Sequence, residues 1–343
     1  MDTDQTNQDE GNDTDDLFVI IDNKRNLTLD FAKGLAILLM VFDHIIGRGK
    51  IITSFHMPLF FLISGYLLKE ESWIDTLKKK SKGLLLPYIR FSLLVLVVGF
   101  IKARLYLHAT WQATGNYLLQ KVLDTCMARD IWLLWFLLAL FESILIYTGI
   151  RQIFSNRIWR SVAVILVFLG GYFLSQKYGS DNFYYLDQGM MATLFIAIGD
   201  LAKRLPWERL HKNKIVGMSI WGIMLILWML GVRYGALVMA NRVYQGFPLC
   251  ILSAVAGTYV VIWCSYYVKE IPLVGSSLIW CGQHTLEILC FANLFRQFCD
   301  WKALCRGWGI NSVLLMFLIQ AGMILGLVLI CDRIKGCKNS WKR

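Results

Sequence analysis

Long runs of apolar residues, separated by short polar or charged segments, fill almost the whole chain. Ten of these runs approach the roughly 20 residues that a helix needs to cross a bilayer. We expect the spans at residues 29–48, 52–68, 84–102, 132–150, 160–176, 189–203, 215–233, 246–267, 273–296 and 312–331. The span at 189–203 is short, and the one at 273–296 carries several polar residues. The pattern therefore predicts an all-α, polytopic transmembrane bundle of about ten helices.

The composition supports a membrane protein and disfavours a soluble nucleic-acid binder. Hydrophobic residues make up 57% and charged residues 17% of the 343 residues, and the mean hydropathy is +0.52. The net charge of +11 comes from Lys and Arg in short clusters between apolar runs, not on one soluble face. The nine cysteines show no metal-ligand spacing, so we expect no metal, although Cys299 and Cys305 could form a bridge in an outer loop.

The distribution of basic residues predicts the orientation of the bundle. With the N-terminus in the cytoplasm and an even number of spans, the cytoplasmic segments hold 21 of the 35 Lys and Arg residues. Cytoplasmic loops of membrane proteins carry such an excess. We therefore expect both termini in the cytoplasm.

Three regions are expected along the chain. Residues 1–23 form an acidic tail, since the first sixteen residues contain seven acids and no base and bury too little apolar surface to order. No basic segment with a following cleavage site marks a signal peptide. Residues 24–335 form the membrane domain and 336–343 a basic cytoplasmic tail. The stretch at 103–131 is expected to be an outer loop with some amphipathic helix.

Two polar side chains in the first span stand out because they share a helical face. Lys33 and His44 are eleven residues apart, which is about three helical turns and roughly 16 Å along the axis. Ionisable groups inside a bilayer are costly, so they are retained chiefly where they pair or act. With the predicted orientation, Lys33 lies near the inner surface and His44 toward the outer one. The position of both residues on one helical face predicts a polar path across the membrane.

These residues also carry a resemblance to a known family. Asp30, Lys33 and His44 are similar to the flanking acid and the (Arg/Lys)-x10-His pattern of the membrane acyltransferase-3 family. Phe55-His56-Met57-Pro58-Leu59-Phe60-Phe61, followed by Ser64-Gly65-Tyr66, resembles the family's second-helix signature, and fainter matches occur at residues 82–88 and 135–137. The Lys-x10-His spacing alone is a weak indicator of the family. It becomes a specific indicator when the second-helix signature follows it.

The chemistry of His44 fits acyl transfer to a hydroxyl. A neutral imidazole takes a proton near physiological pH and returns it, so we expect His44 to be the general base. A structural histidine held between helices is the alternative reading. His56 opens the second span at a similar depth and is expected to assist, unless it is only an interfacial histidine beside Pro58. Asp43 points about 100° away from His44 and is expected to pair elsewhere.

Basic residues near the inner surface are candidates for binding an acyl donor. The resemblance implies acetyl-CoA as donor substrate, with no bound cofactor, and its phosphates suit Lys33, Lys79, Lys82 and Arg90. Lys33 also forms an i,i+3 pair with Asp30 that could be mere neutralisation. The run from Lys78 to Arg90 is equally explained by topogenic positive charge.

A late segment, Cys281-Gly282-Gln283-His284-Thr285-Leu286-Glu287, resembles the family's Gly-x-Asn-(Ser/Thr)-Leu stretch with one departure. His284 stands where Asn is common, and Ala292 or Asn293 stands where many members carry a histidine. Glu287 is either an acceptor-site carboxylate or a structural partner of Arg296.

The resemblance implies an integral O-acyltransferase of the bacterial cytoplasmic membrane. It would move an acetyl group from cytoplasmic acetyl-CoA to a hydroxyl of a cell-surface or lipid-linked carbohydrate. The expected partners are these two substrates and membrane lipids, without nucleic acid. The alternative is a transport or binding module for a small polar substrate such as serine, because the same architecture resembles the membrane part of vancomycin-resistance serine racemases. Discontinuous helices would favour that alternative, and Gly170-Gly171 is the internal pair suggestive of one.

Overall fold

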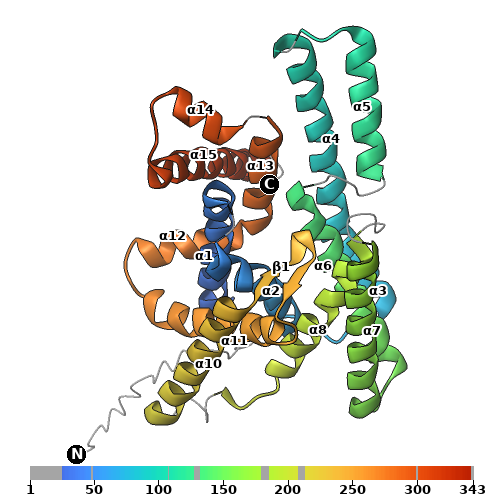
Figure 1. Cartoon of the computed structure of the whole chain (residues 1–343), viewed down its shortest axis with the longest axis vertical. Helices are drawn as coiled ribbons and strands as arrows, with labels where there is room; N and C mark the ends of the chain where they lie inside the picture. The colour runs from blue at the N-terminus through green and yellow to red at the C-terminus, as the bar shows by residue number, and fades with distance from the viewer. Residues whose placement is uncertain are drawn as a thin grey trace, which may run out of the picture.

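The computed structural model describes residues 25–47, 49–106, 108–126, 132–178, 185–207, 213–298 and 300–340, with side chains up to 334. This part of the chain is almost entirely helical (Figure 1). The elements are α1 Leu27–Ile46, α2 Lys50–Tyr66, α3 Trp73–Lys80, α4 Leu86–Ile101, α5 Trp111–Cys126, α6 Trp135–Ile153, α7 Arg157–Tyr178, α8 Leu186–Ala202, α10 Lys214–Tyr234, β1 Ala236–Val238, β2 Val243–Gln245, α11 Leu249–Val268, α12 Val274–Gln283, α13 Thr285–Phe298, α14 Trp301–Gly307 and α15 Val313–Ser340.

Six helices among the described residues are long and apolar enough to cross a membrane. They are Trp73–Leu105, which joins α3 and α4 through a π-helical turn, and α6, α7, α10, α11 and the Val313–Ile334 part of α15. The predicted all-α membrane class is therefore supported. Helices also form at the predicted spans 29–48, 52–68 and 189–203, but the count of ten spans and the orientation stay predictions.

The segment predicted as one span at 273–296 is broken. The helix stops at Gln283 and restarts at Thr285, with His284 between them outside the helical conformation (φ −115°, ψ 25°). The predicted outer loop at 103–131 contains the well-formed α5, which runs back along α4, as the bond from the Tyr88 hydroxyl to the Thr125 carbonyl (2.9 Å) shows. Residues 1–24 and Cys299 lie outside the described residues, so the acidic tail and the Cys299–Cys305 bridge stay predictions.

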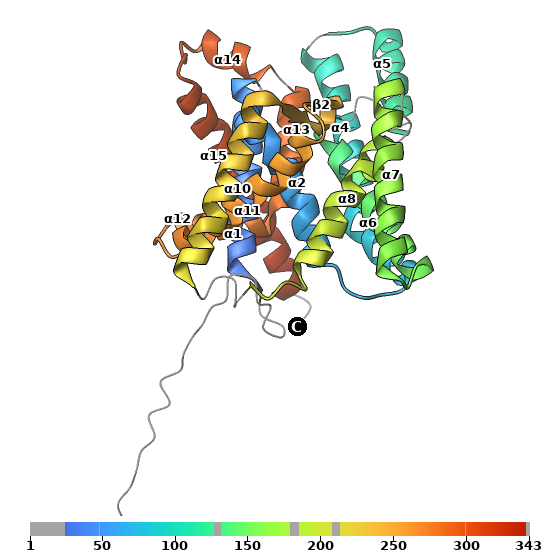
Figure 2. The ribbon, with the colours of Figure 1, turned by 60° about the horizontal axis from the view of Figure 1, so that its bottom comes forward.

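The helices give the bundle two ends, seen in Figure 2. We call the end where α1 begins and where α2, α8 and α15 finish the lower end, and the opposite end the upper end. Three loops meet at the lower end: the Lys203 ammonium donates to the Leu68 carbonyl (3.4 Å), and the Arg151 guanidinium to the Lys69 carbonyl (2.9 Å). The predicted cytoplasmic loops therefore gather on one side.

The central helix is α2, in which thirteen of seventeen residues are buried. It packs against α1, α8 and α11, and Phe60 and Phe61 contact Phe136 of α6 with ring centroids 5.6 and 5.2 Å apart. Most of α10, by contrast, is exposed. The signature FHMPLFFLISGY is thus the core of the fold, and outer helices such as α10 offer apolar side chains to lipid.

Glycines let α2 cross α8 at very short range. A Cβ on Gly65 would lie 2.1 Å from the Ile196 carbonyl oxygen, and one on Gly199 would lie 2.1 Å from the Leu62 carbonyl oxygen. Lipid tails are as apolar as leucine, so helices in a bilayer associate through such close packing. The glycine of the second-helix signature is therefore required by packing.

Glycines also let α1 cross α12 at very short range. A Cβ on Gly34 would lie 1.8 Å from the Leu278 carbonyl oxygen, and one on Gly282 would lie 1.7 Å from the Asp30 carbonyl oxygen. The two helices that carry Asp30, Lys33 and the late motif are consequently locked together near the lower end.

Candidate functional site

A cavity of about 340 Å³ lies at the upper end where α1 finishes and α2 begins. Its lining combines α1, α2, the β1–β2 hairpin, α13 and the residues around the start of α6 and α8. The lining residues are Met40, Asp43, His44, Gly47, Thr53, His56, Met57, Leu133, Trp135, Tyr185, Val238, Met239, Ala240, Asn241, Leu289 and Arg296. We call it the histidine cavity, because both histidines singled out in the sequence face it.

His56 is oriented by its own helix. The side chain is buried, and Nδ1 lies 2.8 Å from the carbonyl oxygen of Ile52, one turn earlier. A carbonyl oxygen only accepts, so Nδ1 carries the proton, and in the neutral ring Nε2 is then unprotonated. His56 thus offers a nitrogen with a lone pair, the form that a base requires.

His44 has the opposite arrangement. Its Nδ1 lies 2.9 Å from Nη1 of Arg296 on α13. A guanidinium group has no acceptor, so Nδ1 of His44 accepts the bond, and the neutral ring carries its proton on Nε2. His44 therefore has an N–H donor where His56 has a lone pair.

The turn between α1 and α2 brings the two histidines to one cavity. Gly47 ends α1 in the left-handed conformation (φ +83°), which favours glycine. The buried Asp43 carboxylate then accepts the Gly49 N–H at 2.6 Å and so caps the start of α2. Asp43 thus bonds to the backbone at the start of α2 and fixes the geometry of the turn.

The β1–β2 hairpin forms one wall of the cavity and is held by a buried polar network. Arg242 donates two bonds to Asp187 at the start of α8 (2.7 and 3.1 Å), and Asp187 is fully buried. Gln188 donates to Asp187 (2.9 Å) and accepts from the Tyr244 hydroxyl (2.6 Å). Burial raises the pKa of Tyr244, which keeps this hydroxyl a donor. A bidentate buried pair is a strong, directional anchor.

A second cavity of about 430 Å³ adjoins the histidine cavity and shares His44, Leu133 and Arg296 with it. Its other walls are more polar. They are formed by Val41, Ile45, Lys102, Ala292, Asp300, Trp301, Lys302 and Gln320. His44 and Arg296 thus stand between two spaces at the upper end.

Lys33 lies in a different environment, at the lower end of α1. Its ammonium is 2.6 Å from Asp30, whose carboxylate is also 2.5 Å from Arg25 Nε and 3.5 Å from the Gln283 amide. Asp30 is buried, and Lys33 is mostly buried. Lys33 lines neither cavity that His44 lines. A continuous passage from Lys33 to His44 therefore stays a prediction.

The other predicted donor-binding cations are spread over the lower end and α4. Lys79 pairs with Glu71 (2.6 Å) and lines a cavity of about 470 Å³ together with Lys69 and Lys80. Lys82 and Arg90 are exposed and do not line that cavity. Of Lys79, Lys82 and Arg90, the structure thus places Lys79 in a cavity with other basic residues, which we call the lysine cavity.

The late motif has structural contacts. His284, at the break between α12 and α13, stacks on Trp280 (ring centroids 4.4 Å apart), and its Nε2 lies 3.3 Å from Asp332 of α15. Glu287 lies in the first turn of α13, whereas Arg296 lies in the last turn and contacts His44. Both readings of Glu287, as an acceptor-site carboxylate and as a structural partner of Arg296, stay predictions.

The sequence did not indicate the Arg296–His44 contact or the Arg242–Asp187 pair. The partners are 252 and 55 residues apart, so no local spacing relates them. For Arg296, which ends the predicted span at 273–296, the available signal was the cost of an arginine within an apolar segment, which predicts a partner without identifying it. Arg242 lies between predicted spans and gave no such signal.

Comparison with known proteins gives the family. Residues 26–332 match the model of the acyltransferase-3 family, described as an acyltransferase domain. The nodulation protein NolL of Mesorhizobium japonicum is 35% identical over 91 residues, which cover 21% of this chain and 24% of that protein. NolL of Sinorhizobium fredii is 30% identical over 141 residues, or 35% of this chain and 36% of that protein.

The aligned regions therefore span about a quarter to a third of these relatives, and no solved structure matches the chain. The family model, in contrast, covers nearly all of the helical bundle, including both histidines, Lys33, Arg242 and Arg296. The chain belongs to the acyltransferase-3 family of membrane acyltransferases.

Proposed function

We propose that this protein is an integral-membrane O-acyltransferase of the bacterial cytoplasmic membrane, which moves an acetyl group from acetyl-CoA to a hydroxyl of a cell-surface carbohydrate. Acetyl-CoA approaches from the lower, cytoplasmic end, and the carbohydrate binds at the upper end. Family membership supports acyl transfer. The donor, the acceptor and the residue roles are the proposal.

The observation that carries the proposal is the complementary state of the two histidines in one cavity. His56 presents an unprotonated Nε2 because Nδ1 is bonded to the Ile52 carbonyl, and His44 presents an Nε2–H because Nδ1 accepts from Arg296. Acyl transfer needs one group that takes a proton and one that stabilises an oxyanion. The cavity provides a candidate for each.

In the proposed reaction the acceptor hydroxyl oxygen attacks the thioester carbonyl carbon while its proton moves to Nε2 of His56. The carbonyl π electrons move to oxygen, and the resulting oxyanion accepts a bond from Nε2–H of His44. The tetrahedral intermediate then collapses, the carbon–sulfur bond breaks, and the proton on His56 passes to the leaving thiolate. The products are the acetyl ester and free CoA.

This division of roles differs from the expectation that His44 is the base. A base at His44 requires the other tautomer, in which Nδ1 would carry a proton and could not accept from Arg296. The positive charge of Arg296 also favours electron-rich groups beside it, such as an oxyanion. The role of His44 as base remains the alternative that mutagenesis distinguishes.

The lysine cavity at the lower end is the proposed site for the donor's phosphates. Lys69, Lys79 and Lys80 line it beside the end of α2, and ammonium groups bind phosphate oxygens through charge-assisted bonds. Leu67, which also lines it, follows His56 by eleven residues, about 16 Å along α2. The acyl-bearing arm of CoA would have to bridge this distance, with Lys33, Lys82 and Arg90 as the more peripheral predicted contacts.

The second cavity is the proposed acceptor site. Asp300, Lys302, Lys102 and Gln320 offer hydrogen bonds to sugar hydroxyls, and the Trp301 ring offers an apolar face. A site built to bond hydroxyl groups rejects analogues that lack them. Because His44 and Arg296 line both cavities, a hydroxyl bound there lies next to the reaction site.

Surface-glycan mass spectrometry tests the function. Three cell lines are compared: cells lacking the protein, cells restored with the wild type, and cells restored with His44→Ala. Insertion of the variant is checked in purified membranes. We expect the acetyl mass to disappear in the first and third lines alone. Equal acetylation in all three would refute the proposal.

A transport or binding role is the second candidate, and one observation favours it. The α12–α13 helix is interrupted at His284, as in transporters with discontinuous helices. The Gly170-Gly171 pair, in contrast, lies inside the continuous α7 and packs against Met190. Protein in lipid vesicles separates the two functions: a transferase releases free CoA from acetyl-CoA when acceptor is present, whereas a transporter leaves the thioester intact.

A further inference from the structure

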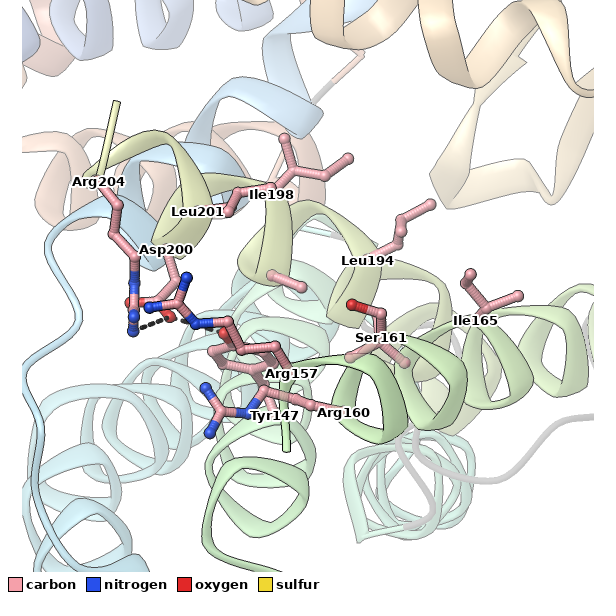
Figure 3. A pocket seen from close by; sticks show the side chains of 12 residues that line it. Tyr147, Arg157, Arg160, Ser161, Ile165, Leu194, Ile198, Asp200, Leu201 and Arg204 are labelled. Atoms are coloured by element: carbon pink, nitrogen blue, oxygen red, sulfur yellow. Dashed lines mark hydrogen bonds and ion pairs between the residues drawn. The ribbon is translucent and has the colours of Figure 1, made fainter. Parts of the chain in front are cut away.

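Another pocket, which neither His44 nor His56 lines, lies between α7 and α8 at the lower end (Figure 3). It is a pocket of about 270 Å³. Figure 3 shows its arginines, Asp200 and Tyr147 gathered on one side, and Leu194 and Ile165 on the other. The lining residues are Tyr147, Arg157, Arg160, Ser161, Val164, Ile165, Leu194, Ala197, Ile198, Asp200, Leu201 and Arg204. We call it the arginine pocket.

The charges around Asp200 partly neutralise one another. The Tyr147 hydroxyl donates to Asp200 at 2.7 Å, and the guanidinium groups of Arg204 and Arg151 lie 3.7 and 3.9 Å from the same carboxylate. Arg204 is also 3.6 Å from the exposed Glu70. Two carboxylates therefore face two of the arginines.

The other two arginines have no carboxylate partner within the described part of the chain. Arg160 donates from Nε and Nη2 to the Phe154 carbonyl (3.2 Å each), which is a neutral acceptor. Arg157 begins α7 and makes no ion pair with a described residue. Among the described residues, no carboxylate therefore compensates these two positive charges at the rim of the pocket.

The apolar half of the pocket opens toward the lipid-facing surface. Ile165 and Leu201, which line it, are both exposed. On the same helix as Ile165, Ile158, Leu166 and Phe173 are exposed as well. Since α7 is long and apolar enough to cross a membrane, this face of it is the face that acyl chains cover.

We propose that the arginine pocket binds an anionic phospholipid, with its phosphate between Arg157 and Arg160 and an acyl chain along Ile165, Leu194 and Leu201. Basic pockets between transmembrane helices at the cytoplasmic side suit such headgroups. Guanidinium groups bind phosphate oxygens in pairs of charge-assisted bonds. The apolar lining next to these arginines distinguishes a lipid from a soluble anion, which gains nothing from it.

Native mass spectrometry of the purified full chain from mixed bilayers of phosphatidylglycerol and phosphatidylcholine tests the proposal. We expect the wild type to retain phosphatidylglycerol preferentially. The double variant Arg157→Gln/Arg160→Gln should bind it about thirtyfold more weakly, because each basic residue near the surface contributes roughly a factor of five. The matched control Lys177→Gln/Arg233→Gln removes two exposed charges at the upper ends of α7 and α10, and it should retain the lipid.

A second variant tests the shape of the pocket without changing its charge. Ser161→Phe fills the pocket beside the arginines and should also reduce the retained phosphatidylglycerol, while the melting temperature in phosphatidylcholine shows whether the fold is intact. Equal retention by the wild type and the double arginine variant would overturn the proposal. So would equal stabilisation by glycerol 3-phosphate, which indicates a free-anion site, or displacement of the lipid by acetyl-CoA, which indicates a donor site.

Discussion

The two ends of α1 carry the two polar residues of the Lys-x10-His pattern in very different surroundings. At the lower end, Lys33 lies against Asp30 (2.6 Å), which is buried and also bound by Arg25 and Gln283. At the upper end, His44 lies between two cavities, and its partner is a cation, Arg296. At the lower end the cation of the pattern is paired with a buried carboxylate, whereas at the upper end the histidine and its arginine partner line two cavities.

This difference separates what stabilises the bundle from what can perform chemistry. A buried carboxylate with three donors around it is satisfied, so its replacement is felt mainly in the free energy of unfolding. His44 lines two cavities, so a substrate bound in either of them can contact the imidazole. We therefore expect substitutions at the upper end to affect turnover and substitutions at the lower end to affect stability.

The largest effect is expected from His56→Asn. Asparagine can still donate to the Ile52 carbonyl, but it offers no basic nitrogen, so kcat should fall by about 10²–10⁴-fold. Turnover is measured as release of free CoA by protein in lipid discs supplied with acceptor. Met57→Leu, on the same helix and lining the same cavity, is the matched control and should stay active. If His56→Asn is active and His44→Gln is not, the base is His44.

Sequence reasoning identified both histidines and assigned the base to His44, whereas the contacts favour His56 as the base. The Lys-x10-His spacing and the second-helix signature place His44 and His56 on neighbouring helices, and the turn between them brings both to one cavity. The tautomer of His44 depends on Arg296, 252 residues away. That of His56 depends on a backbone carbonyl four residues earlier, a local bond that a helical histidine often makes but that spacing does not require. The proposed roles therefore rest on contacts that only the three-dimensional structure gives.

An intermediate effect is expected from Arg296→Met. In the proposed mechanism Arg296 positions His44, so its loss should lower kcat by about tenfold to a hundredfold. The specific readout is the tautomer: long-range ¹H–¹⁵N correlation of labelled protein should show His44 protonated on Nε2 in the wild type and a mixture of tautomers in the variant. Arg306→Met, an exposed arginine on α14, is the control. An unchanged tautomer in Arg296→Met would remove this role.

Hydrophobic periodicity predicted the helices of the bundle better than their interruptions. Helices form at each predicted span because a run of apolar residues in lipid must satisfy its backbone internally. The break at His284 was not predicted, because no proline or glycine stands at that position. The side chain of His284 stacks on Trp280, one turn earlier, and contacts Asp332 of α15, and the sequence does not show these contacts. The glycines at helix crossings were visible in the sequence, but their partners, such as Gly65 with Ile196, were not.

The smallest effect on turnover is expected from Lys33→Met, which tests the lower end directly. The substitution leaves Asp30 buried with Arg25 and Gln283 as partners, so the free energy of unfolding should fall by about 1–3 kcal/mol. The double variant Asp30→Asn/Lys33→Met should recover part of this loss, because it removes the buried carboxylate, whose remaining ion-pair partner Arg25 is largely exposed. Thermal unfolding in lipid discs and the KM for acetyl-CoA are measured on the same samples. A raised KM with unchanged stability would mean that Lys33 binds the donor, as the sequence pattern first indicated, and that both ends of α1 serve the reaction.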